Sequence, residues 1–195
     1  MNIFDDILEK FIDEIKDIQT VEYKDIPNID LYMDQVTTFI DEILCGNKRY
    51  PDDKILTKTM INNYAKAKIF PPPVKKKYTK NHLMLLIIIY HLKTVFSIHD
   101  ISLLLKPVTD ELNAHEHSEL LEKIYSGFVH LQKDNQENIS DIIAGNYEFV
   151  LSHKDKLEEY EDEKIKLIMT VLLLSIQANT EKRLAEKILD TCFQK

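Results

Sequence analysis

Apolar residues recur at every third or fourth position along most of this chain, a spacing that places them on one face of an α-helix. The first apolar stripe runs from Ile3 to Ile18 and leaves Asp and Glu on the opposite face. The pattern breaks around Pro27, and a second helix is expected from about Leu31 to Leu44. Its inward residues would be Tyr32, Val36, Phe39, Ile40 and Ile43.

A third helix is expected over residues 57–68, after a loop that is rich in Asn, Asp and Pro. Thr57 can cap this helix, because its hydroxyl can accept a hydrogen bond from an amide of the first turn. Ile61 and Tyr64 would face inward. The three consecutive prolines that begin at Pro71 must end the helix, since proline lacks an amide donor and disfavours helix in the residue before it.

Two more helices are expected on the C-terminal side of the prolines. A strongly apolar helix should cover residues 79–95. Ser97, with Asp100 three positions later, has the spacing of a capping box and predicts a short helix that stops before Pro107.

The rest of the chain forms a second block of helical stripes, over residues 120–131, 142–150 and 184–193. Residues 165–176 are apolar on nearly every side, so this segment is expected to be a central helix or one that pairs with a second molecule. At least one of Leu172, Leu173 and Leu174 should then be buried, in the fold or in a dimer. Three Gly and six Pro in 195 residues leave few tight turns, so the fold class is all-α.

Charge is distributed unevenly along the chain, although its formal net charge is −8. Lys plus Arg number 3 against 12 Asp plus Glu in residues 1–45, 11 against 2 in residues 46–98, and 11 against 19 in residues 99–195. We call residues 46–98 the basic island. Such an asymmetry indicates a nucleic-acid or membrane surface, or simply a solvated helix face.

Several classes of protein are disfavoured by the sequence. Cys45 and Cys192 lie far apart and belong to no C-x-x-C motif, which argues against a disulfide or zinc framework. The N-terminus turns acidic within five residues, unlike a signal peptide. The longest unbroken apolar run, from Leu83 to Tyr90, is far shorter than the roughly 20 residues of a membrane span. We therefore expect a soluble cytoplasmic protein without membrane contact.

Catalytic patterns are weak as well. His115, Glu116 and His117 form the only tight histidine cluster, but side chains two positions apart point to different faces of a helix. The three glycines are isolated, so no glycine-rich phosphate loop is present. We expect no enzymatic activity, no metal and no cofactor.

From Leu56 onward, the chain resembles the DNA-binding region of MerR-type regulators. The matching elements are Ile61-x-x-Tyr64, Lys66-Ala67, the apolar pair Ile69-Phe70, Pro71-Pro72, Lys77-Tyr78-Thr79 and a helix that ends at Leu92-Lys93. A closer resemblance, over about residues 27–108, is to an uncharacterised bacterial family described as domain of unknown function 1836, whose members share much of TKTMINNY and PPPVKKKY. The resemblance implies a helix-turn-helix with a short wing.

A DNA-binding surface in this region also makes chemical sense. A short helix with outward amides and lysines can lie in a major groove, where Asn pairs with adenine and Lys binds guanine edges or phosphates. The wing lysines would neutralise phosphates, which fixes register without reading sequence. The residues expected to contact DNA are Lys58, Thr59, Asn62, Asn63, Lys66, Lys75, Lys76, Lys77, Tyr78 and Lys80.

Three features, one loop and two single residues, depart from the MerR pattern. About a dozen residues, 45–56, replace the usual tight turn between the first two helices, Asn62 stands in place of an Arg, and Lys68 replaces a Gly. A left-handed backbone at Lys68 would be strained. The alternative to a DNA-binding regulator is a protein-interaction module on a degenerate helix-turn-helix scaffold.

We expect three parts along the chain: an acidic N-terminal helix over residues 1–25, a MerR-like helix-turn-helix region over residues 26–108, and a helical block over residues 109–195. The last block would serve dimerisation, with a homodimer as the assembly, or effector sensing.

Overall fold

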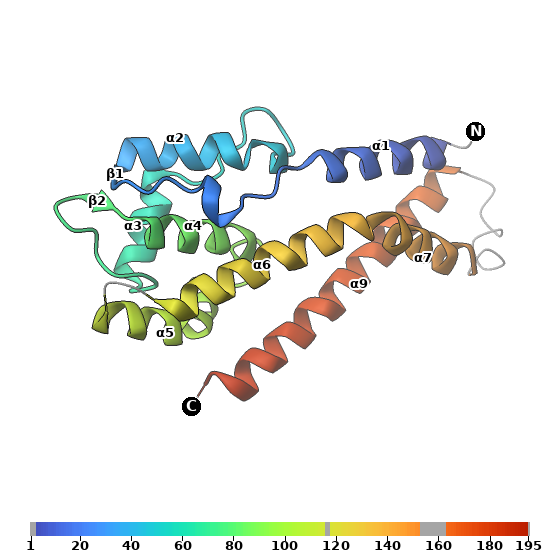
Figure 1. Ribbon diagram of the computed structural model, residues 1–195. Coiled ribbons are helices and arrows are strands. Elements are labelled where there is room, and N and C mark those ends of the chain that lie inside the picture. Colours follow the sequence, from blue (N-terminus) through green and yellow to red (C-terminus); the bar gives the residue numbers. More distant parts are fainter. Residues whose placement is uncertain (1–2, 116–117, 153–162, 195) are drawn as a thin grey trace. The chain divides into compact units, whose positions relative to one another are not determined.

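The computed structural model of this chain describes residues 3–115, 118–152 and 163–194. The chain divides into two compact units, one of residues 17–134 and one that combines residues 1–16 with residues 135–195. Helices dominate each unit (Figure 1), which confirms the all-α prediction. No helix within the described residues is long and apolar enough to cross a membrane.

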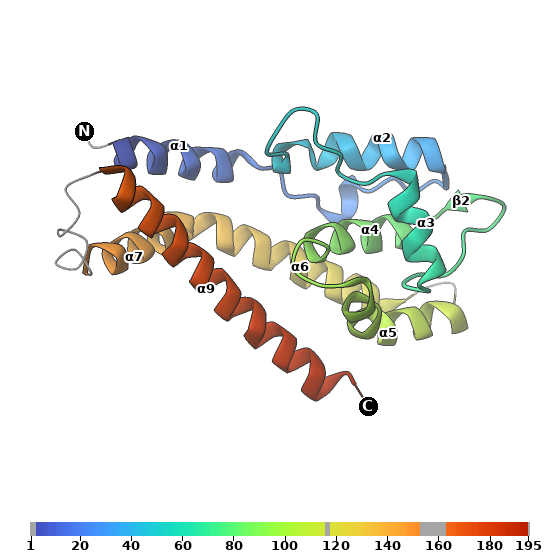
Figure 2. The ribbon, with the colours of Figure 1, turned by 180° about the vertical axis from the view of Figure 1, so that it is seen from behind.

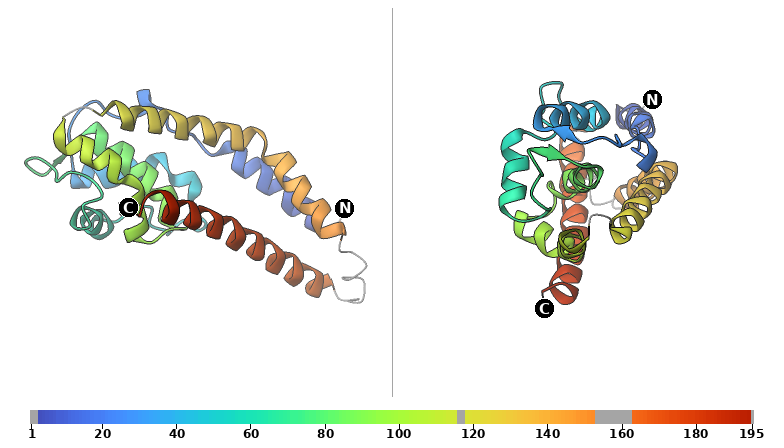
Figure 3. Two further views of the ribbon diagram at one scale, coloured as in Figure 1. Left: turned by 90° about the horizontal axis from the view of Figure 1, so that it is seen from below. Right: turned by 60° about the vertical axis from the view of Figure 1, so that its left-hand side comes forward.

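The unit of residues 17–134 is built around α4 (Lys80–Leu92), in which every side chain from Leu83 to Ile89 is buried. Its other elements are a 3₁₀ turn η1 (Tyr23–Asp25), β1 (Leu31–Tyr32), α2 (Met33–Ile43), a 3₁₀ turn η2 (Cys45–Asn47), α3 (Lys58–Lys66), β2 (Lys77–Tyr78), α5 (Ile98–Ala114) and most of α6 (Glu119–Glu137). The right-hand view of Figure 3 shows α2, α3, α5 and α6 around α4. An apolar helix without a polar face is stable only when it is surrounded in this way.

Local sequence sets the N-termini of α3 and α5. The Thr57 hydroxyl accepts a hydrogen bond from the Met60 amide at 3.2 Å. The Ser97 hydroxyl accepts one from the Asp100 amide at 3.2 Å, and the Asp100 carboxylate accepts one from the Ser97 amide at 3.1 Å. Both caps are confirmed, because each satisfies amides that the first helical turn leaves without a partner.

A two-stranded antiparallel sheet, which the sequence did not predict, pairs Leu31 with Tyr78 and Tyr32 with Lys77. The predicted helix from Leu31 is therefore wrong by two residues, and Tyr32, expected to face inward, is exposed. Tyr32 instead precedes α2 with an extended backbone, and its amide donates to the Gln35 side chain at 2.9 Å. Such a cap ends the strand and begins the helix.

α5 continues through Pro107, where the sequence predicted a stop. A proline inside a helix costs about 3 kcal/mol, because it removes a hydrogen bond and its ring crowds the preceding turn. Leu105 and Val108 are buried on either side of it. The buried Thr109 hydroxyl is 2.8 Å from the Ile69 carbonyl and 3.0 Å from the Leu105 carbonyl. Packing of both flanks therefore maintains the helix.

The residues just before Pro27 are attached to α6. The Tyr125 hydroxyl donates to the carbonyl of buried Val21 at 2.9 Å, and Lys133 contacts Glu22 at 2.5 Å. The ammonium groups of Lys133 and Lys24 hold the pKa of Glu22 at about 2. This unit thus begins before residue 26, inside the segment that was expected to form the N-terminal helix.

The second unit contains α1 (Ile3–Asp17), the end of α6, α7 (Ile139–Ser152) and α9 (Glu163–Cys192). Ile139, Ile143 and Leu189 are buried there, and the Gln136 side chain donates to the Ile15 carbonyl at 3.2 Å. Of the two alternatives for residues 165–176, exposed side chains contradict the central helix, and pairing with a second molecule stays a prediction. Within residues 165–176, the large apolar side chains that remain 42–63% exposed are Ile168, Val171, Leu172, Leu174 and Ile176.

Candidate nucleic-acid interface

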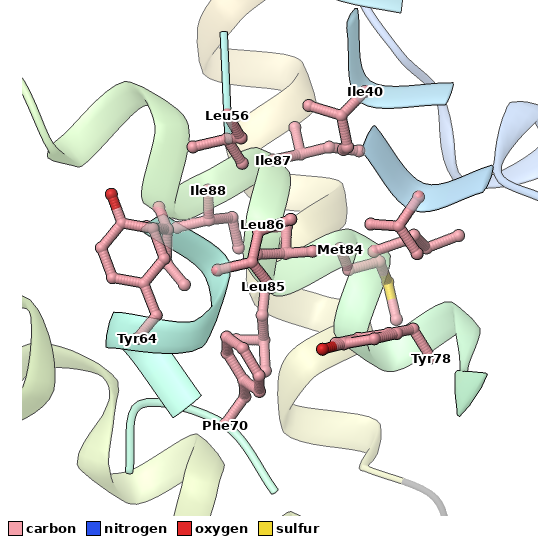
Figure 4. Packing of buried hydrophobic residues seen from close by; sticks show 14 of the residues in the cluster. Ile40, Leu56, Tyr64, Phe70, Tyr78, Met84, Leu85, Leu86, Ile87 and Ile88 are labelled. Carbon is pink, nitrogen blue, oxygen red and sulfur yellow. The ribbon is translucent and has the colours of Figure 1, made fainter. Parts of the chain in front are cut away.

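α3 has one apolar and one polar face. Ile61 and Tyr64 are buried against the core, as predicted, and Figure 4 shows the Tyr64 ring beside α4. At 100° per residue, the outward residues span an arc of about 140°. These exposed residues, which we call the polar face of α3, are Lys58, Thr59, Asn62, Asn63 and Lys66. All five belong to the predicted contact set, and their amides, hydroxyl and ammonium groups can bind base edges and phosphates.

The C-terminus of α3 closes on a residue with a left-handed backbone. Lys68 has φ of 57°, the Lys68 amide donates to the Ala65 carbonyl at 3.0 Å, and the Ile69 amide donates to the Tyr64 carbonyl at 3.1 Å. These two bonds define a Schellman motif, in which glycine is the favoured residue at the left-handed position. The strain anticipated at Lys68 is therefore present. Figure 2 shows this end of α3 beside α5.

The predicted wing is a tight turn of residues 74–77, which we call the lysine turn. Lys75 and Lys76 have φ of 51° and 65°, and the Lys77 amide donates to the Val74 carbonyl at 3.0 Å. Two central residues with positive φ give a type I′ turn, which Asn-Gly normally forms. Figure 1 and the left-hand view of Figure 3 show the turn projecting from the end of the unit that carries α3.

His82 supports the segment that leads to the lysine turn. Its Nε2 lies 2.8 Å from the Pro71 carbonyl oxygen, and its Nδ1 lies 3.0 Å from the Thr79 amide. Because a carbonyl can only accept, Nε2 carries the proton and Nδ1 accepts. Burial lowers the pKa of His82. His82 was not predicted from the sequence, although its position three residues after the cap at Thr79 is that of a capping-box partner.

Tyr78, one of the predicted contacts, cannot reach DNA, because it is only 3% exposed. Side chains alternate along β2, so Lys77 points toward solvent and Tyr78 toward the core. Its ring lies beside Met84 in Figure 4 and packs edge-on against His82, with 5.5 Å between ring centroids. The assignment of Tyr78 to the DNA-binding surface was wrong.

The remaining predicted lysines differ in their partners. Lys58 forms an ion pair with Asp34. The Lys77 ammonium lies 5.4 Å from the Tyr32 ring centroid, and that of Lys80 lies 3.6 Å from the Tyr23 ring centroid. Within the described residues, the side chains of Lys66, Lys75 and Lys76 have no ion-pair or hydrogen-bond partner. An aromatic contact leaves the charge of a lysine in place, whereas a carboxylate offsets it.

Other chemistry has little support where the structure describes the chain. No three His, Cys, Asp or Glu side chains in residues 3–115, 118–152 and 163–194 lie close enough to hold a metal ion. His115 is exposed at the end of α5, and Glu116 and His117 lie outside the described residues. Cys45 and Cys192 are exposed free thiols.

Comparison with protein families matches residues 21–128 to a family described as "Domain of unknown function (DUF1836)". The matched residues lie within the unit of residues 17–134 and include α3 and the lysine turn. The match extends beyond the likeness over residues 27–108 at both ends. No curated protein and no solved structure matches the chain.

Proposed function

The chain belongs to the family of domain of unknown function 1836, and from the surface described above we propose that it binds double-stranded DNA as a cytoplasmic, MerR-like regulator of bacterial transcription. The polar face of α3 enters the major groove, and the lysine turn contacts the phosphate backbone. The protein acts by binding and not as an enzyme.

The observation that carries this proposal is the backbone conformation of Lys75 and Lys76 in the lysine turn. Lys68, Lys75 and Lys76 are the only non-glycine residues with positive φ in the described part of the chain. An L-residue pays roughly 1–2 kcal/mol to adopt this conformation, and glycine avoids that cost. The side chains of Lys75 and Lys76 have no ion-pair or hydrogen-bond partner within the described residues. No contact of these side chains within the protein offsets the conformational cost, and we infer that binding to a polyanion does.

Salt dependence tests the proposal. The protein should bind a pool of random duplexes, and its affinity should fall steeply between about 50 and 200 mM salt, because phosphate contacts release counterions. Two variants are compared. One replaces Lys75, Lys76 and Lys77 with Ala, and the other replaces three exposed lysines outside the proposed DNA surface, Lys10, Lys123 and Lys182. Both variants lose three charges, and only the first should lose most of the binding.

The rival function is a protein-interaction module on the same scaffold. Apolar protein contacts change little with salt, so the two functions differ in the same titration. Absence of salt-sensitive binding to any duplex would reject the DNA proposal and favour the rival.

We also propose a homodimer, since DNA readers of this kind commonly pair two half-sites about 34 Å apart through a twofold axis. The exposed apolar residues of α9, among them Ile168, Leu172 and Ile176, support this part of the proposal. Burying such a face in a symmetric contact would remove apolar surface from water.

A further inference from the structure

Asp34 lies in the first turn of α2, and its carboxylate forms an ion pair with Lys58, the first residue of α3. Six lysines were expected to contact DNA: Lys58, Lys66, Lys75, Lys76, Lys77 and Lys80. Within the described residues, Lys58 alone among them has a carboxylate partner. The acidic segment of residues 1–45 therefore reaches the polar face of α3 through the pair of Asp34 with Lys58.

We propose that Asp34 is a positioning residue: it restrains Lys58 and so weakens the sequence-independent binding of DNA. This inference rests on the proposed function. In the free protein, the carboxylate holds the Lys58 ammonium at the start of the polar face. A phosphate must displace this carboxylate before it can pair with Lys58.

The ion pair has little to do with folding. Its side chains are 79% exposed for Asp34 and 58% exposed for Lys58. Exposed pairs of this kind contribute little to stability, because water screens the charges and two side chains lose freedom. Removing the pair should therefore leave the fold intact, and its effect on DNA binding can be measured separately.

The restraint acts on the part of binding that carries no sequence information. Phosphate contacts supply essentially all of the affinity for random DNA, whereas contacts of Asn62 and Asn63 with base edges depend on sequence. A carboxylate that pairs with a phosphate-binding lysine therefore lowers the affinity for random DNA directly. It also repels nearby phosphates over a screening length of about 10 Å at 0.1 M salt.

Replacing Asp34 with Asn tests the inference. The variant should bind random duplexes two- to fivefold more tightly at low salt, and its salt slope should increase by about one, the value for one additional phosphate contact. Asp34→Glu keeps the charge and should bind like the unmodified protein. A merely structural role for Asp34 would not move the salt slope.

Asp41→Asn is the matched control. Asp41 lies on the same helix and pairs with Lys48 at 2.9 Å, but Lys48 is not part of the polar face of α3 or of the lysine turn. The control loses the same charge, so any gain that it shares with Asp34→Asn is an effect of net charge. Equal gains in the two variants would overturn the inference.

A double-mutant cycle separates restraint of Lys58 from simple repulsion of DNA. In a Lys58→Ala background, Asp34→Asn should no longer increase the salt slope, because the lysine that it releases is absent. A slope increase that persists in this background would also overturn the inference. If the unmodified protein binds no duplex, the proposed function fails first; if it binds and Asp34→Asn equals its control, only the role of Asp34 fails.

Discussion

The Nε2–H group of His82 donates a hydrogen bond to the carbonyl oxygen of Pro71, with 2.8 Å between nitrogen and oxygen. This bond ties the start of α4 to the proline segment that leads into the lysine turn. Nδ1 of the same ring accepts from the Thr79 amide. A protonated imidazole could not accept there, so the contact requires a neutral histidine.

Stability should consequently depend on pH. Burial lowers the pKa of His82 and of His91 below the ordinary value of 6.5. Below pH 6.5, the unfolded chain binds protons that the folded chain does not, so the free energy of unfolding should fall as the pH decreases toward 5 and stay level above about 7.5. Urea unfolding at several pH values measures this, and His82→Gln should reduce the dependence to the part that His91 contributes. Glu22 has a pKa of about 2, below its ordinary value of 4.5. Its stabilising effect is therefore complete above about pH 5 and is lost only as the pH falls from about 4.5 toward 2.

Replacing Lys68 with Gly should stabilise the protein by about 1 kcal/mol, because glycine adopts the left-handed conformation without a steric cost. The same substitution at Lys66, two residues earlier and within α3, should instead destabilise it by roughly 0.5–1 kcal/mol. Thermal or urea unfolding of both variants provides the comparison. A loss of stability in Lys68→Gly would contradict the strain that we assign to this position.

Thr109→Val should cost about 1–3 kcal/mol, because it leaves the buried carbonyl of Ile69 without its hydroxyl donor while keeping the side-chain volume. Thr180→Val is the control: that hydroxyl bonds only to its own helix and is exposed. If the two variants unfold at the same urea concentration, Thr109 does not maintain α5 around Pro107.

Substitutions of Asn62 and of Lys75 should change the affinity for DNA in different ways. Asn62→Ala should cost roughly 1–3 kcal/mol on a preferred sequence selected from the random pool and little on random duplexes, because it removes a base contact. Lys75→Ala should weaken binding to every sequence about equally and lower the salt slope by about one. Titrations of both variants on both kinds of duplex distinguish these roles, and equal effects on the two duplexes for Asn62→Ala would remove it from base reading.

Sedimentation tests the homodimer. The unmodified protein should sediment as a dimer at micromolar concentration, and Leu172→Glu should sediment as the 22.9 kDa monomer, because it places a charge in the apolar face of α9. Lys164→Glu, on the same helix, is a control for added negative charge. A monomeric unmodified protein would exclude the pairing of two half-sites by this face.

Local signals in the sequence were sufficient to predict α3 and its polar face. The Thr57 cap, the spacing of Ile61 and Tyr64 and the prolines all act within a few residues, so the buried and exposed faces of this helix followed from them. The burial of Tyr78 could not be predicted in this way, because a strand of two residues is too short to show an alternation of buried and exposed positions. Its pairing with Leu31 depends on a partner far away in sequence.

The same sequence pattern had different outcomes in α4 and α9. Both contain an apolar stretch without a polar face, yet residues 83–89 are buried whereas Ile168 and Leu172 are exposed. Periodicity reports what a helix can bury and not which elements surround it. In Figure 3, α2, α3, α5 and α6 of its own unit lie around α4, and no pattern within the sequence of α4 predicts that arrangement.

The hydrogen bond from Tyr125 to Val21 decides where the chain can be shortened. A protein that begins at residue 26 would lose most of the acidic residues that precede the basic island. It would also remove the carbonyl that the buried Tyr125 hydroxyl needs, at a cost of about 1–3 kcal/mol. Loss of DNA binding in that protein would then include the effect of lower stability and would not isolate the role of the acidic residues. A shortened chain should keep residue 17 and everything that follows it.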